Sequence, residues 1–287
     1  MREKQKAFTL LEMMVATTIF VLLALLMSQI IGPAIEVVSK GRRVSDLQSR
    51  ARAALDVIAR DVGNGIYRAD LTTFSDGTGD PALAFFTRRP GLAAPTADPS
   101  DSRQLSFVVY EVLSERSGQP DFSLWRGSIN VEWDDNQTYP PMTLSGPLPF
   151  ITGGVATAFQ QSSQAPTLEP VLEGVLRLEL RFLGTDGLYR NTYNSDPTAV
   201  DPVSKAVSIT LLVTDEKTHG QSVADPTLVT ALTTNFLGSS GKLLSPNETD
   251  VSLGTLWNQA LADSTTWSGL PPRLRNIYAF ERIIPLR

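Results

Sequence analysis

The stretch KAFTLLEMMVATTIFVLLALLMSQIIGPAIEVV, residues 6–38, decides the fold of this chain of 287 residues. From Met13 to Ile35 it holds 23 consecutive residues without a charge. A helix needs about 20 such residues to cross the hydrocarbon core of a membrane. A buried core helix of this length would carry a polar face. A cleaved secretory signal would have a shorter apolar region and a small-residue cleavage site. We therefore expect a transmembrane helix over residues 8–35.

Charged residues stand on the N-terminal side of this segment. Arg2, Lys4 and Lys6 precede it, with Glu3 as the acidic exception. Basic flanks stay cytoplasmic, so the N-terminus is predicted inside the cell and the chain after residue 40 outside the inner membrane. Glu12 is the only charge between Ala7 and Ile35. A carboxylate in a membrane segment usually has a function and an interaction partner. A Glu at the level of the lipid headgroups can also have no function.

The residues directly before the apolar run, KAFTLLE (6–12), resemble the class III signal of type IV prepilins and pseudopilins. That signal has a short basic leader, a small residue, usually Gly where this chain has Ala7, and then Phe-Thr-Leu-(Leu/Ile)-Glu. The resemblance implies that a prepilin peptidase removes leader residues 1–7 by cutting between Ala7 and Phe8. It also implies N-methylation of the new Phe8 amine.

The same resemblance implies a role for Glu12 in assembly. The resemblance implies that its carboxylate pairs with the N-terminal amine of a neighbouring subunit in a filament. Physical reasoning agrees, because opposite charges in a medium of low dielectric attract strongly. We expect both groups to lack a partner within one subunit and to gain one on assembly.

Beyond the membrane segment, the sequence predicts a second, amphipathic half of the same helix. Gly32 and Pro33 interrupt the apolar run, and because Pro removes a helical hydrogen bond we expect a kink or local melting there. Apolar residues then recur at intervals of three and four over residues 37–62, which is typical of an amphipathic helix. We expect this continuation to occupy residues 36–66, with a stop signal at residues 63–65.

The rest of the chain, residues 67–287, is predicted to form an exported β-rich domain. Alternating apolar and polar residues predict antiparallel strands with one buried face, and helical spacing predicts a small helical insertion at about residues 216–270. The fold class is therefore α+β and pilin-like: a long N-terminal helix packed against an antiparallel β-sheet domain. The expected strands cover residues 104–113, 123–133, 171–184, 205–214 and 274–287.

Three further stretches, residues 50–62, 172–187 and 270–287, resemble J-type minor pseudopilins of type II secretion, and the first also resembles W-type minor pilins. The resemblance implies a structural subunit of a periplasmic pseudopilus for protein secretion, held in the inner membrane with its C-terminal domain in the periplasm. Its implied partners are other pseudopilins or pilins, the prepilin peptidase and the inner-membrane assembly platform.

Two alternatives to that function remain open from the sequence. One is a minor type IV pilin for pilus assembly, adhesion or DNA uptake. The other is a membrane-anchored binding protein of a specialised pilin-like gene cassette. Cargo, ligand and position within a filament tip are not encoded in any recognisable motif.

The composition disfavours most enzyme classes. The chain has 0 Cys and 1 His, which removes thiol nucleophiles, thiolate metal sites and multi-His sites together. His219 is the single candidate for His-based acid–base chemistry, and we expect it in a solvated polar loop. The stretch GSSGKL, residues 238–243, lacks the spacing of a phosphate-binding loop. We expect no catalytic residue and no cofactor, and the net charge of -5 argues against nucleic-acid binding.

Three Asp-rich stretches could offer oxygen ligands to Ca²⁺, as loops of some pseudopilins do. None has EF-hand spacing, and turn formation is the expected use of their Asp residues. These stretches are residues 75–80, 132–136 and 194–201.

Aromatic residues are expected to serve mostly in core packing, with a contact surface as the alternative. They are the Phe85–Phe86 pair and Trp125, Trp133, Trp257 and Trp267. Loss of residues 1–7 would leave 22 basic and 29 acidic side chains, a net charge of -7.

Overall fold

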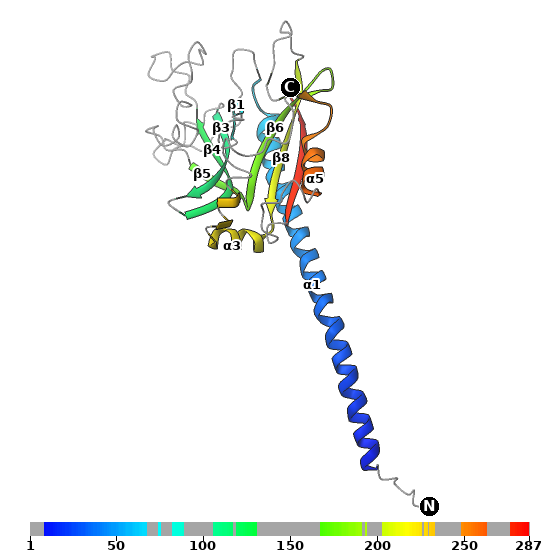
Figure 1. The fold of residues 1–287 in the computed structure, drawn as a ribbon. Helices are drawn as coiled ribbons and strands as arrows, with labels where there is room; N and C mark the ends of the chain where they lie inside the picture. The colour runs from blue at the N-terminus through cyan, green and yellow to red at the C-terminus, as the bar shows by residue number, and fades with distance from the viewer. Residues whose placement is uncertain are drawn as a thin grey trace, which may run out of the picture. The chain divides into compact units, whose positions relative to one another are not determined.

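The computed structural model describes residues 9–67, 74–75, 82–88, 106–116, 119–130, 167–190, 193, 203–225, 227–228, 230–232, 248–262 and 276–286. The chain divides into two compact units, Met1–Asp46 and Leu47–Arg287. The described part of the first unit consists of Thr9 and most of helix α1 (Leu10–Gly63). The last turns of α1 belong to the second unit (Figure 1).

The N-terminal half of α1 is continuous through Gly32 and Pro33. The expected local melting at this position is therefore not present. A proline removes one backbone hydrogen bond and crowds one carbonyl, while the apolar residues on both sides keep their own helical bonds. One lost bond does not divide a helix of 54 residues.

The C-terminal half of α1 shows the predicted amphipathic pattern. Its buried residues recur at intervals of three and four, and the helix ends at Gly63, inside the predicted stop signal. After this end, Gly65 N–H donates to the carbonyl oxygen of Val62 at 2.9 Å. The buried positions of the helix are Leu47, Ala51, Ala54, Leu55, Ile58, Asp61 and Val62.

The first sheet, sheet A, is an antiparallel meander in the order β1-β2-β3-β4-β5. Its strands are β1 (Phe74–Ser75), β2 (Ala82–Thr87), β3 (Ser106–Arg116), β4 (Gln119–Asn130) and β5 (Thr167–Glu173). The sequence predicted β3 and β4 but not β2, which carries the buried Phe85 and Phe86. Core packing is thus the use of this aromatic pair, and Trp125 on β4 is likewise buried.

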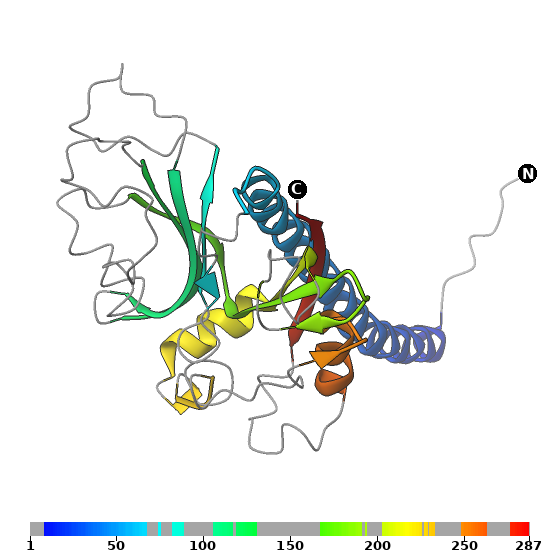
Figure 2. The ribbon, with the colours of Figure 1, turned by 90° about the horizontal axis from the view of Figure 1, so that it is seen from above.

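The second sheet, sheet B, is also antiparallel and has the order β10-β8-β6-β7-β9. Figure 2 shows the two sheets as separate layers. Sheet B contains β6 (Val175–Gly184), β7 (Tyr189–Arg190), β8 (Ser204–Thr214), β9 (Glu248–Thr249) and β10 (Ile277–Pro285). The α+β prediction is confirmed, with two sheets where one was expected.

Gly174 joins the two sheets. The sequence predicted one strand over residues 171–184, but the chain leaves sheet A at Glu173 and enters sheet B at Val175. Gly174 makes this turn with φ of +74°, a conformation that a side chain disfavours. Its carbonyl oxygen accepts the backbone N–H of Thr214 at 2.8 Å, so the corner is held against β8.

The predicted helical insertion is present between β8 and β10. It contains α3 (Glu216–Ala224), helical residues at 227–228 and 230–232, and α5 (Leu253–Ala262). The sequence predicted the insertion as a whole, but placed His219, which lies in α3, in a loop. Asp215 accounts for α3, because its side chain accepts the backbone N–H of Thr218 at 2.9 Å, a helix N-cap.

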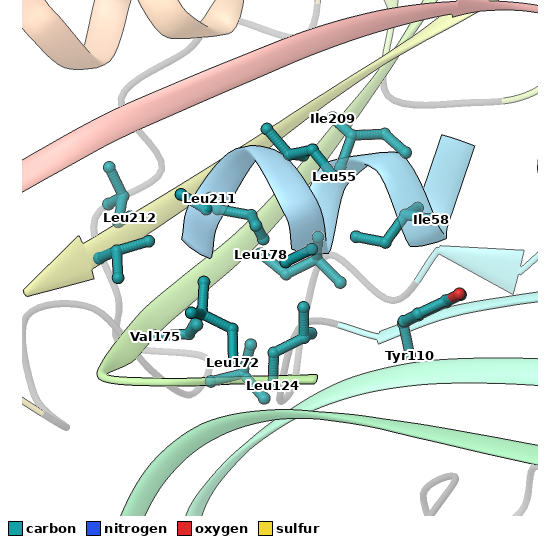
Figure 3. Packing of buried hydrophobic residues seen from close by; sticks show 14 of the residues in the cluster. Leu55, Ile58, Tyr110, Leu124, Leu172, Val175, Leu178, Ile209, Leu211 and Leu212 are labelled. Carbon is teal, nitrogen blue, oxygen red and sulfur yellow. The ribbon is translucent and has the colours of Figure 1, made fainter. Parts of the chain in front are cut away.

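One hydrophobic core joins the end of α1 to both sheets. Figure 3 shows Leu55 beside Ile209 of sheet B, and Ile58 on the side of Tyr110 of sheet A. The inner face of β6 contributes Leu176, Leu178, Leu180 and Phe182 to the same core. The core of the second unit therefore combines the end of α1, both sheets and the helical insertion.

Candidate functional site

The first residues that the structure describes form a helix cap. Thr9 precedes α1, and its Oγ1 accepts the backbone N–H of Glu12 at 3.3 Å. The Oε2 of Glu12 lies 3.5 Å from the backbone N of Thr9, in the direction of a returned hydrogen bond. This reciprocal arrangement is a capping box, which satisfies free N–H groups at a helix start. Ala7 and Phe8 lie outside the described residues.

The capping box corrects one expectation about Glu12. We expected its carboxylate to have no partner within a single subunit, yet it reaches back to the Thr9 backbone N–H. The reason is that the first turn of any helix has unpaired N–H groups that attract an acceptor. At 3.5 Å the contact is long, and Glu12 remains exposed, so its carboxylate keeps capacity for a further partner.

Helix α1 presents an apolar surface after this cap. It is long and apolar enough to cross a membrane, and none of its most apolar window is buried. This exposure rules out the alternative of a buried core helix. The hydroxyls of Thr17 and Thr18 both donate to the carbonyl oxygen of Met14, at 3.0 and 2.7 Å, so they do not need water. Exposed large apolar residues continue from Leu10 to Val38.

The other end of α1 is fixed to sheet A by a buried carboxylate, which we call the Asp61 cluster (Asp61, Tyr110 and Arg126). Asp61 is fully buried, and its Oδ2 accepts the hydroxyl of Tyr110 at 2.6 Å and Nε of Arg126 at 2.7 Å. Burial and the Asp61 charge raise the pKa of the Tyr110 phenol. Desolvation lowers the pKa of Arg126, but the hydrogen bonds and charges of Asp61 and Tyr110 together more than offset this and raise that pKa.

A second buried charge cluster lies on the outer face of β6, and we call it the β6 cluster (Arg177, Glu179 and Arg181). Nε of Arg177 donates to Oε2 of Glu179 at 3.3 Å, and Arg181 lies 3.9 Å from Oε1 of the same carboxylate. Trp257 of α5 covers the cluster and donates its indole N–H to Glu179 at 2.9 Å. Burial lowers the pKa of Arg181. The cluster attaches α5 to the sheet.

His219, the sequence-based candidate for acid–base chemistry, is placed on α3 and not in the expected loop. Its half-buried side chain lies beside the corner at Gly174. Within the described ranges, no group of three or more His, Cys, Asp or Glu could hold a metal ion. Residues 238–243, Trp133 and Trp267 fall outside the described residues, as does almost all of the three Asp-rich stretches.

Sequence reasoning missed the Asp61 cluster and the capping box. The pattern Thr-x-x-Glu before an apolar run is a recognised capping signal, so Thr9 and Glu12 could have been found. Asp61 had no comparable signal, because its partners Tyr110 and Arg126 are 49 and 65 residues away in sequence.

Comparison with known proteins agrees with the N-terminal geometry. The family model for the prokaryotic N-terminal methylation motif matches residues 2–28. No curated protein matches the chain significantly. Among solved structures, the chain is similar to a type IV-like pilin, TTHA1219 from Thermus thermophilus. The similarity is 14% identity over 83% of this chain and 94% of that chain, with a TM-score of 0.37.

The methylation motif overlaps the start of the apolar helix. Residues 2–28 combine a methylation motif with the start of an exposed apolar helix, and this helix ends in the core of an α+β domain. The chain therefore carries a prokaryotic N-terminal methylation motif at the start of a long apolar helix.

Proposed function

We propose that the protein is a minor pseudopilin, a non-catalytic subunit that is processed by a prepilin peptidase and assembled into a periplasmic pseudopilus for protein secretion. The observation that carries the proposal is the methylation motif at residues 2–28, which overlaps the start of the exposed apolar helix α1. In this proposal the peptidase cuts between Ala7 and Phe8, and the amine of Phe8 is methylated. The helix anchors the precursor in the inner membrane, with the β-rich domain in the periplasm.

Assembly follows from the surface that α1 exposes. Its apolar side chains have no partner among the described residues of one subunit, so packing against the helices of other subunits can replace lipid. Glu12 selects the register of that packing by pairing with a neighbour's N-terminal amine. An apolar setting strengthens this pairing, and the long contact to Thr9 is weak enough to be exchanged.

Processing is tested by intact-mass analysis of the protein purified from a host that expresses the cognate peptidase. The expected mature species begins at Phe8 and is heavier by one methyl group than the bare peptide sequence. Co-expression with a catalytically inactive peptidase is the control and should leave the leader attached. A chain that still begins at Met1 with active peptidase would overturn the proposal.

Glu12 is tested with two substitutions that separate its charge from its capping role. Glu12→Gln keeps an oxygen that can accept the Thr9 N–H, whereas Glu12→Ala removes it. We expect both variants to be processed and both to be lost from filaments. Normal filament incorporation of Glu12→Gln would show that the carboxylate charge has no assembly role. Co-purification of either secretion pseudopilins or pilus pilins with the wild-type chain distinguishes the pseudopilus from a type IV pilus.

A further inference from the structure

Three basic residues follow the last exposed apolar residue of α1, and we call them the basic band (Lys40, Arg42 and Arg43). The apolar surface ends at Val38, which is 55% exposed, and Lys40 and Arg42 are exposed immediately beyond it. Neither Lys40 nor Arg42 makes a side-chain hydrogen bond or ion pair within the described part of the chain. Two charged side chains are thus available at the point where the apolar surface stops.

The spacing of the band from Glu12 matches the thickness of a membrane. Lys40 lies 28 residues after Glu12, which is about 42 Å along an α-helix. A bilayer measures about 40–45 Å when its headgroup regions are included, of which about 30 Å is hydrocarbon. With Glu12 at one headgroup layer, the basic band reaches the opposite one.

The band's distribution around the helix favours lipid over a protein partner. At about 100° per residue, Lys40 and Arg42 project about 160° apart, on nearly opposite sides of α1. One flat protein surface cannot contact both, whereas lipid headgroups surround a membrane helix. Glu36 lies one turn earlier and leaves residues 36–43 with a net charge of +2, so the region still attracts anions.

We propose that the basic band binds the phosphates of anionic phospholipid headgroups, on the membrane side remote from the N-terminus, and so fixes the depth of α1. Long Lys and Arg side chains reach headgroups readily from a helix end. This inference rests on membrane anchoring by α1. After the proposed removal of residues 1–7, the only basic side chains close to either end of the membrane segment are those of the basic band.

Lipid titration of the purified full-length chain in neutral detergent tests the proposal. Native mass spectrometry counts bound dioleoylphosphatidylglycerol and, separately, bound dioleoylphosphatidylcholine. We expect tighter binding of phosphatidylglycerol, weakened about fivefold by Arg42→Gln and about 25-fold by Lys40→Gln with Arg42→Gln. Arg52→Gln removes the same charge ten residues further along α1 and should leave the affinity unchanged.

Helix depth gives a second readout. Because the chain has no Cys, Val38→Cys provides one site for an environment-sensitive fluorophore in phosphatidylcholine vesicles with or without phosphatidylglycerol. We expect phosphatidylglycerol to shift the emission of the chain that keeps its basic band, and not that of the double variant.

Three results would overturn the proposal: equal binding of both lipids, an equal loss with Arg52→Gln, or unchanged lipid binding with reduced capture of another pilin-like subunit, which would indicate a protein contact. These assays use the isolated chain, so they can fail while processing at Phe8 succeeds, and the reverse also holds.

Discussion

At the scale of single residues, Asp61 shows how a charged side chain can organise a core. The carboxylate sits at the end of α1 and is held by two donors from neighbouring strands of sheet A. A helix that slid or rotated by one position would lose both bonds together. The cluster therefore fixes the register between helix and sheet, where apolar contacts alone tolerate small shifts.

Asp61→Asn should lower the free energy of unfolding of the second unit by about 3 kcal/mol, because it leaves Arg126 largely buried without its counter-charge. Urea unfolding followed by circular dichroism measures this. The matched control is Asp56→Asn, whose carboxylate pairs with Arg282 at an exposed site, and which should cost less than about 1 kcal/mol. Equal losses from the two variants would remove the special role of Asp61.

Asp186 offers a pH test at the surface of sheet B. Its carboxylate accepts two bonds from Arg190, at 2.9 and 2.6 Å, and this hydrogen bonding lowers its pKa to about 2 from 3.8. A depressed folded-state pKa adds stability above the unfolded value and loses it as the pH falls from about 3.8 through about 2. NMR titration should show the low pKa in the wild type and a rise toward 3.8 in Arg190→Gln. An unchanged value in that variant would contradict the assigned cause.

At the scale of elements, the corner at Gly174 divides one run of sequence between two sheets. Gly174→Ala places a methyl group 3.1 Å from both Thr214 oxygens at a φ of +74°, which should destabilise the unit by about 2 kcal/mol. Thermal unfolding measures the loss. Gly187→Ala is the control, because Gly187 has a similar φ of +89° but open space around it, so it carries only the backbone strain. If Gly174→Ala lost no more stability than Gly187→Ala, the contact with β8 would be shown to be unimportant.

The elements also show how far sequence reasoning reaches. Strands such as β3, β4, β8 and β10 were predicted from the alternation within each one, although β8 is buried on both faces and not on one as expected. The division into two sheets was not, because residues 171–184 alternate on both sides of Gly174 and a one-residue corner leaves no change of period. Helix α3 was missed because its own residues are polar and its start depends on the Asp215 cap.

The features of the candidate site likewise differ in whether the sequence could predict them. The signal around Glu12 is local, so one short stretch of sequence predicted it. The Asp61 cluster depends on contacts between distant segments, so the sequence could not place that charge in the core. The basic band lay within the predicted amphipathic helix, but the exposure of Lys40 and Arg42 became visible only in the structure.

At the scale of the whole second unit, the last strand completes a structure that the first helix begins. Strand β10 pairs along its length with β8, contributes Ile277 and Ile284 to the core, and places Arg282 against Asp56 of α1. Deletion of residues 277–287 should abolish cooperative unfolding, measured by calorimetry. If the deleted chain aggregates, Ile284→Ala tests the same point, with an expected loss of about 2–4 kcal/mol. The exposed neighbour Ile283→Ala should cost under about 1 kcal/mol, and equal costs would contradict the argument.

The contact between β10 and α1 also means that the core can be completed only after β10 has been synthesised. A ribosome releases α1 first and β10 last, so the core around Leu55 and Ile58 stays incomplete while more than 200 residues are still being made. During that interval the oldest part of the chain is open to proteases and chaperones. The earliest moment of protease resistance is therefore fixed by the synthesis of β10, whatever the speed of the folding step itself.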